Sequence, residues 1–161
     1  MDPRLAPLAE MLRLNTRLFQ NCLAGLADDK AQTRPTDITN SAAFVAAHLA
    51  SSRYYLLSVL GVEQPSPLKG ADDGFNDISK VTAFPSLAEI QKAWNAAGET
   101  LQQRLGVLTS AQLDAPIDPG FPLVSQSQLG VIVFMVQHEG YHLGQLGLLR
   151  KHAGMPAMTY D

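Results

Sequence analysis

Residues 138–145 read HEGYHLGQ, in the middle of an apolar run from Leu129 to Leu149. An α-helix repeats every 3.6 residues, so His138 and His142 lie one above the other on the same face of a helix. Two imidazoles that face inward from one helix present their nitrogens to a common point, which suits a divalent metal ion. The stretch therefore predicts a buried, histidine-bearing helix against which the rest of the chain packs.

The composition indicates a single globular domain over residues 1–161, with 46% hydrophobic and 17% charged residues. The net charge is −3 without a basic cluster, so we expect neither nucleic acid nor a membrane as partner. The one cysteine, Cys22, excludes an internal disulfide and fits a reducing compartment. Because we find no secretory signal and no uninterrupted stretch of about 20 apolar residues, we expect a cytoplasmic protein.

Four amphipathic segments predict four helices, over residues 7–26, 39–60, 86–108 and 125–152. Strand-like alternation of comparable length is lacking, so the predicted fold is an all-α four-helix bundle. The connection over residues 61–85 is unusually long for a compact domain and favours a crossover between parallel helices, a cover over a site, or both.

Polar residues interrupt the apolar face in two of the predicted helices. His48 and Ser52 stand at such positions in the second helix, and His138, His142 and Gln145 do so in the fourth. Helix bundles build metal and cofactor sites from polar patches on facing helices. We therefore predict that the three histidines hold a divalent metal ion with open coordination positions. Ser52 and Gln145 stand one turn beyond the histidines, where they are candidates to orient a ring or a bound water.

Buried histidines are more often satisfied by ordinary core partners than by a metal. Three histidines on the apolar faces of two helices would each need a hydrogen-bond partner where donors are few. This favours a bound metal ion over ordinary core partners. The identity of the metal stays open among zinc, nickel, manganese, iron and copper.

Residues 138–142 also match the H-E-x-x-H pattern of zinc proteases. A further ligand downstream is lacking, because positions 145 and 148 hold Gln145 and Leu148 and no glutamate follows Glu139. We therefore set the protease interpretation aside. Glu139 is either a base beside the metal or a solvated residue one position round the helix, and both interpretations stay open.

Three further residues have simpler interpretations. Asn15 interrupts the apolar face of the first helix and either faces a polar patch on a neighbour or bonds locally. Cys22 is expected to be a small buried hydrophobe. His152 lies in the last turn of the fourth helix, where it compensates the helix dipole and is not expected to be a ligand.

The runs AHLASSRYYLLSVLG at residues 47–61 and HEGYHLGQLGLLRKHAG at residues 138–154 resemble the DinB-like (YfiT-like) superfamily of metal-binding four-helix bundles. The resemblance places the family's metal triad on His48, His138 and His142. It implies an up-down-down-up bundle with a long crossover between helices two and three, and a homodimer. Characterised branches include transferases and isomerases that use low-molecular-weight thiols such as bacillithiol, mycothiol or glutathione.

These observations support three functional hypotheses. The leading one is a metal-dependent, thiol-dependent S-transferase or isomerase acting on a small electrophile, with Glu139, Gln145 and Ser52 as candidate catalytic residues. The others are a metal-dependent hydrolase of a small substrate and a non-enzymatic, metal-binding stress-response protein. We expect the connections 61–85 and 109–125 to shape the substrate pocket, and because they carry no motif the substrate itself is not predicted.

Overall fold

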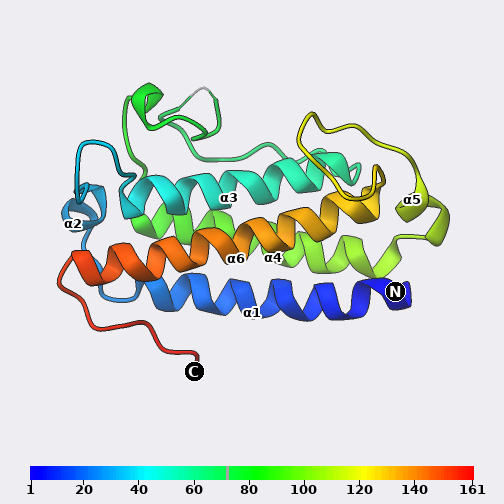
Figure 1. The fold of residues 1–161 in the computed structure, drawn as a ribbon, viewed down its shortest axis with the longest axis horizontal. Coiled ribbons are helices and arrows are strands. Elements are labelled where there is room, and N and C mark those ends of the chain that lie inside the picture. The colour runs from blue at the N-terminus through cyan, green and yellow to red at the C-terminus, as the bar shows by residue number, and fades with distance from the viewer. Residues whose placement is uncertain (72) are drawn as a thin grey trace.

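Four long helices lie side by side in the computed structural model of the chain, which describes residues 1–71 and 73–161 (Figure 1). They are α1 (Ala6–Leu23), α3 (Ala42–Val59), α4 (Leu87–Val107) and α6 (Gln128–His152). Shorter helical elements are α2 (Asp28–Gln32), α5 (Ser110–Asp114) and two 3-10 turns, Pro3–Leu5 and Ile78–Lys80. The described residues form no β-strand, only an isolated bridge between Pro116 and Ser127. The predicted all-α class is confirmed.

The direction of the helices follows from the long connection after α3. Figure 1 shows α3 and α4 running one way and α1 and α6 running the other way. A helix of 18 residues such as α3 is about 27 Å long, so the chain must travel that distance back before α4 begins. The segment over residues 60–86, called the crossover below, makes this return beside α3. Position 72 of the crossover lies outside the described residues.

Side-chain caps fix where the long helices begin. The Ser41 hydroxyl accepts a hydrogen bond from the amide of Phe44 at the start of α3. Ser86 and Glu89 form the capping box that their spacing predicts for α4. Ser127 caps α6 in the same way as Ser41 caps α3. The five-residue α2 was not expected, because its segment is polar and of its residues only Ala31 is buried.

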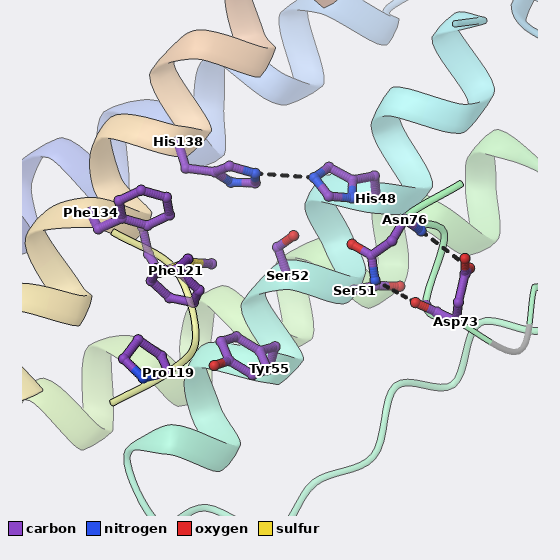
Figure 2. A pocket seen from close by; sticks show the side chains of 12 residues that line it. His48, Ser51, Ser52, Tyr55, Asp73, Asn76, Pro119, Phe121, Phe134 and His138 are labelled. Atoms are coloured by element: carbon purple, nitrogen blue, oxygen red, sulfur yellow. Dashed lines mark hydrogen bonds between the residues drawn. The ribbon is translucent and has the colours of Figure 1, made fainter. Parts of the chain in front are cut away.

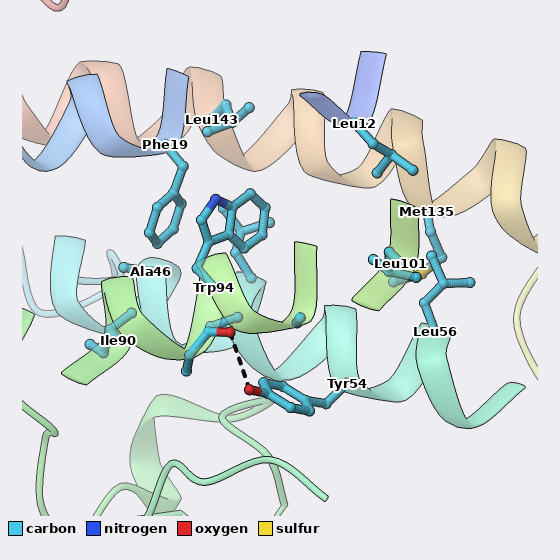
Figure 3. Packing of buried hydrophobic residues seen from close by; sticks show 14 of the residues in the cluster. Leu12, Phe19, Ala46, Tyr54, Leu56, Ile90, Trp94, Leu101, Met135 and Leu143 are labelled. Carbon is cyan, nitrogen blue, oxygen red and sulfur yellow. Dashed lines mark hydrogen bonds between the residues drawn. The ribbon is translucent and has the colours of Figure 1, made fainter. Parts of the chain in front are cut away.

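The core lies between the four long helices, with Trp94 of α4 near its centre (Figure 3). Trp94 is fully buried and stacks on Phe19 of α1, with ring centroids 4.4 Å apart. The same core contains aliphatic side chains from all four helices, including Leu12, Leu56, Leu101 and Leu143.

Helix α3 is buried on most sides. Twelve of its 18 residues are buried, since α4 and α6 pack on it and the crossover runs beside it. Leu60, Leu68 and Phe75 are the buried apolar residues among the described part of that crossover. None of the helices in the described part of the chain, α3 included, is long and apolar enough to span a membrane.

Candidate metal centre

The three histidines singled out in the sequence come together between α3 and α6. His48 projects from α3, and His138 and His142 project from successive turns of α6. One ring nitrogen from each lies within 4.8 Å of the other two. The Nε2 atoms of His48 and His138 are 3.1 Å apart, and a dashed line in Figure 2 joins the two rings. Within the described residues, this is the one group of three or more histidine, cysteine or acidic side chains with such a geometry.

Two of the rings are held by a hydrogen bond at the far nitrogen. Nδ1–H of His48 donates to the backbone oxygen of Phe75 at 3.1 Å. Nδ1–H of His142 donates to Oε1 of Gln145 at 2.7 Å. In each case the proton sits on Nδ1, so Nε2 carries a free lone pair. Gln145 therefore contacts a ring as the sequence suggested, and Phe75 is a second such contact that the sequence did not reveal.

The donor set fits a divalent metal ion. The Nε2 atoms of His48 and His142 are both acceptors, and one proton on His138 can satisfy only one of them. Nδ1 of His138 is buried without a hydrogen-bond partner among the described residues. A cation would accept all three lone pairs at once. Two nitrogens that share a tetrahedral zinc ion lie about 3.3 Å apart, close to the 3.1 Å between His48 and His138.

The surroundings keep these imidazoles neutral. Burial lowers the pKa of His48 to about 4, and repulsion from His142 adds to the effect. Burial, together with the other two histidines, likewise lowers the pKa of His138 to about 4. Burial also lowers the pKa of His142. Neutral imidazole is the form that binds a metal, so at pH 7 the site needs to lose no proton before it does so.

We expect the metal-free protein to lose stability as the pH falls from about 6.5 towards 4. The folded pKa values of His48 and His138 lie below the ordinary value of 6.5, so the unfolded chain binds more protons in this range. Stability is therefore complete above about pH 6.5 and falls by up to about 1.4 kcal/mol per pH unit for each histidine. Urea denaturation of chelator-treated protein at about pH 7, 6 and 5 measures this slope. A slope that persists unchanged when both histidines are replaced by glutamine would contradict the assignment.

Phe75 has an unusual backbone conformation. Its φ of 64° is the one positive value among non-glycine residues in the described part of the chain. A bulky residue in this region is strained, and the strain persists only where the surroundings enforce it. Here the ring is buried, at 1% exposure, while the carbonyl accepts the hydrogen bond from His48. Burial of the ring thus anchors the crossover and directs the carbonyl at a candidate metal ligand.

Phe75→Ala is accordingly expected to weaken metal binding by about 10- to 100-fold, the usual effect of removing a partner of a metal ligand. Phe75→Leu, which keeps an apolar anchor, should restore most of the affinity. Phe84→Ala is the matched control, because Phe84 is a half-buried phenylalanine of the same crossover and lines a different pocket. Competition titration with a chromophoric chelator gives the three affinities. Equal losses for Phe75→Ala and Phe84→Ala would show that the effect is not specific to His48.

Glu139 follows His138 in sequence but belongs to a separate buried network. It is 2% exposed, so the interpretation that it is solvated is wrong. Its Oε1 accepts from Nε of Arg53 at 2.7 Å, and its Oε2 accepts from Nη2 of Arg53 and from Asn15, each at 3.0 Å. The Arg53 guanidinium also donates to Thr16 at 2.8 Å and lies 3.2 Å above the ring of Trp94. A catalytic role for Glu139 stays a prediction, and both of its oxygens are engaged here.

This network connects all four long helices. Of the alternatives for Asn15, the polar patch on a neighbouring helix is the one observed. Gly98 of α4 makes room for the guanidinium, because a Cβ there would lie 2.6 Å from Nη1 of Arg53. A sequence signal for the pair existed: Arg53 is the one charged residue in α3, and Glu139 is the one acid in α6.

The remaining sequence predictions concern isolated side chains. Cys22 is 1% exposed, and burial raises the pKa of its thiol to about 11, which confirms the buried interpretation. His152 is exposed in the last turn of α6 and lies outside the histidine cluster. Ser52 lines the pocket described next, and its predicted role in orienting a ring or a water stays a prediction.

A pocket of about 530 Å³ opens beside His48 and His138 (Figure 2). The connection 61–85 contributes Asp73, Gly74 and Asn76 to its lining. Pro119 and Phe121 come from the connection 109–125. Both motif-free connections therefore line this pocket, and its role as the substrate pocket stays a prediction. A small molecule in this space would lie directly against two of the three histidines.

Comparisons with known proteins agree with this architecture. A family model for the DinB superfamily matches residues 11–146. Comparison with curated proteins finds no match.

Solved structures resemble the chain over almost its full length. A DinB-like protein from Bacillus cereus ATCC 10987 has a TM-score of 0.71 at 18% identity, covering 94% of each chain. A DinB-like protein from Bacillus subtilis has a TM-score of 0.67 at 17% identity, covering 95% of this chain and 96% of the other. A protein from Enterococcus faecalis has a TM-score of 0.67 at 16% identity, covering 91% of this chain and 95% of the other. At these identities the likeness shows the fold.

Proposed function

The chain belongs to the DinB superfamily, and on that basis we propose that its three histidines hold a divalent metal ion for the transfer of a thiol to a small electrophile. The observation that carries the proposal is the convergence of three histidine nitrogens beside a pocket. When bound, the ion supplies Lewis acidity, which lowers the pKa of a thiol or water at an open coordination position.

The residues of the chain supply binding and orientation. His48 and His142 present Nε2 because Phe75 and Gln145 hold their Nδ1 protons. Three protein nitrogens leave at least one position of a tetrahedral ion for an outside group. The one cysteine of the chain is buried, and burial raises its pKa. A nucleophilic thiol would therefore come from a separate molecule, as the proposal requires.

Product analysis tests the proposal. Zinc-, nickel- or manganese-loaded protein is incubated with 1-chloro-2,4-dinitrobenzene in the presence and absence of glutathione, bacillithiol or mycothiol, and the products are identified by mass spectrometry. We expect the loaded protein to form the S-conjugate faster than the thiol and electrophile do without protein, and His138→Ala to lose this acceleration. A hydrolysed product without thiol would instead support a metal-dependent hydrolase. Metal binding without product from a panel of electrophiles would support a non-enzymatic metal-binding protein.

We propose further that the protein is a cytoplasmic homodimer that acts on a small molecule. Support for the dimer comes from the outer face of α6, where a Cβ added at Gly140, Gly144 or Gly147 would meet no atom of the described chain within 4 Å. Leu14 and Leu148 are exposed large hydrophobic residues lining the same pocket as these glycines. Light scattering after size-exclusion chromatography measures the mass, and a monomer at all concentrations would contradict the dimer.

A further inference from the structure

One wall of the pocket beside the histidines is a row of aromatic rings. Phe121 and Phe134 are stacked, with centroids 4.5 Å apart and planes at 25°. Tyr55 meets Phe121 edge-on at 6.2 Å, and Phe134 stacks on the His138 ring at 6.2 Å and 21°. The row therefore leads from Tyr55 to a candidate metal ligand (Figure 2). These residues come from α3, α6 and the connection 109–125, and they are only partly buried or exposed.

The opposite side of the pocket is polar and carries the hydroxyl groups of two serines. Ser51, Ser52 and Asn76 line it together with Asp73. Serines inside a helix usually bond a backbone oxygen one turn earlier or face solvent. Among the residues lining the pocket, neither serine hydroxyl has a hydrogen-bond partner, as Figure 2 shows. Ser51 and Ser52 are both half-buried, so these hydroxyls are available to a molecule that displaces water.

The charge of the lining is also one-sided. Among the described residues that line the pocket, Asp73 is the one acid, and none is a lysine or arginine. The ammonium of Lys80, which does not line the pocket, lies 3.7 Å from the Asp73 carboxylate. An anionic group placed away from the histidines would thus meet a carboxylate and no cation of the described lining. The far part of the pocket favours a neutral or cationic group.

From these two walls we infer that the pocket takes a planar, aromatic or conjugated small molecule whose polar substituent is uncharged or cationic. The flat face lies against Phe121 and Phe134, where offset stacking is favourable. The polar substituent bonds the hydroxyls of Ser51 and Ser52. This inference rests on the proposed function in taking the pocket as the substrate site, and it narrows the substrate to planar electrophiles without a negative charge at that end.

Three probes of similar size distinguish the effect of ligand planarity on affinity from the effect of ligand charge. They are trans-cinnamamide, which is planar and neutral, 3-cyclohexylpropanamide, which is neutral and not planar, and trans-cinnamate, which is planar and anionic. None contains a thiol. Dissociation constants are measured by ¹H–¹⁵N NMR titration on metal-free protein, where no cation at the histidines can attract the carboxylate, and again on zinc-loaded protein. Zinc affinity is measured separately by competition.

We expect trans-cinnamamide to bind the metal-free protein about two- to tenfold more tightly than either of the other probes. Phe134→Leu should reduce that preference for the planar probe, and Ser52→Ala should weaken both amides. Phe84→Leu is the control, since Phe84 is a half-buried phenylalanine that lines a different pocket. Its affinities should match those of the unmodified protein.

Equal affinities for the planar and the cyclohexyl amide, or a preference that survives Phe134→Leu, would overturn the inference. Tighter binding of trans-cinnamate than of trans-cinnamamide to metal-free protein would do the same. The proposed function fails separately, if zinc does not bind. A protein that binds zinc without preferring the planar amide refutes only the inference, and one that prefers the planar amide without binding zinc refutes only the metal-dependent function.

Discussion

Replacing His138 with alanine is expected to reduce the affinity of the protein for zinc by about three orders of magnitude, because one of three ligands is lost. A metal at about 1,000 times its dissociation constant adds about 4 kcal/mol to the free energy of unfolding. Loss of the ion should therefore lower the melting temperature measured with zinc by about 8–16 °C. Metal content by mass spectrometry, competition titration and melting curves with and without zinc give the three measurements.

The matched control is His152→Ala. His152 lies on the same helix as His138, but it is exposed and outside the cluster. This variant should keep its zinc content and its rise in melting temperature. If His138→Ala still held one ion per chain with unchanged affinity, His138 would not be a ligand.

Replacing Glu139 with leucine is expected to cost about 3–5 kcal/mol of stability, because it leaves the Arg53 guanidinium buried without its counter-charge. Arg53 is 1% exposed and has its bidentate carboxylate partner in Glu139. In the double variant Arg53→Met, Glu139→Leu no buried charge remains, so most of the loss should be recovered. Urea denaturation of the two single variants and the double variant measures the coupling between the residues.

The same variants test the catalytic role predicted for Glu139. If the carboxylate acts only within the network, the double variant should bind zinc and form product as the unmodified protein does. If Glu139 takes part in proton transfer, the double variant should recover stability and zinc content while activity stays low. A double variant as unstable as the single ones would show that the pair is not the source of the effect.

Helical periodicity carried most of the fold prediction. The spacing of apolar residues and the Ser86–Glu89 capping box were enough to place the four long helices within a few residues. The same periodicity placed His48 on the apolar face of one helix, and His138 and His142 on the apolar face of another. Residues three or four positions apart in a helix share one face. The long, Pro- and Gly-rich connection after α3 indicated the crossover for a steric reason, since parallel neighbours need a return path.

What periodicity could not give is the rotation of a helix relative to several neighbours. Consecutive helical residues point about 100° apart, and α6 packs against both α1 and α3. The face that carries the histidines and the face that carries Glu139 are therefore both covered by neighbouring helices. A prediction that assigns each helix one buried face would have left one of them exposed to solvent. The Phe75 carbonyl was unpredictable for another reason, because backbone oxygens carry no signature in sequence. The contact between Tyr55 of α3 and Phe121 of the connection 109–125 could not be predicted either, because it joins residues that are far apart in the sequence.

The position of Trp94 decides what optical spectroscopy of this protein will report. It is the one tryptophan in the chain, it is fully buried, and its Nε1–H donates to the backbone oxygen of Thr16 at 3.3 Å. With Phe19 on one side and the Arg53 guanidinium over its ring, the indole samples the junction of the helices, not the pocket. Its fluorescence should thus be blue-shifted in the native protein and move to longer wavelength only when the bundle opens. Occupancy of the histidines or the pocket can then be followed with an external dye while the indole emission independently records whether the fold is intact.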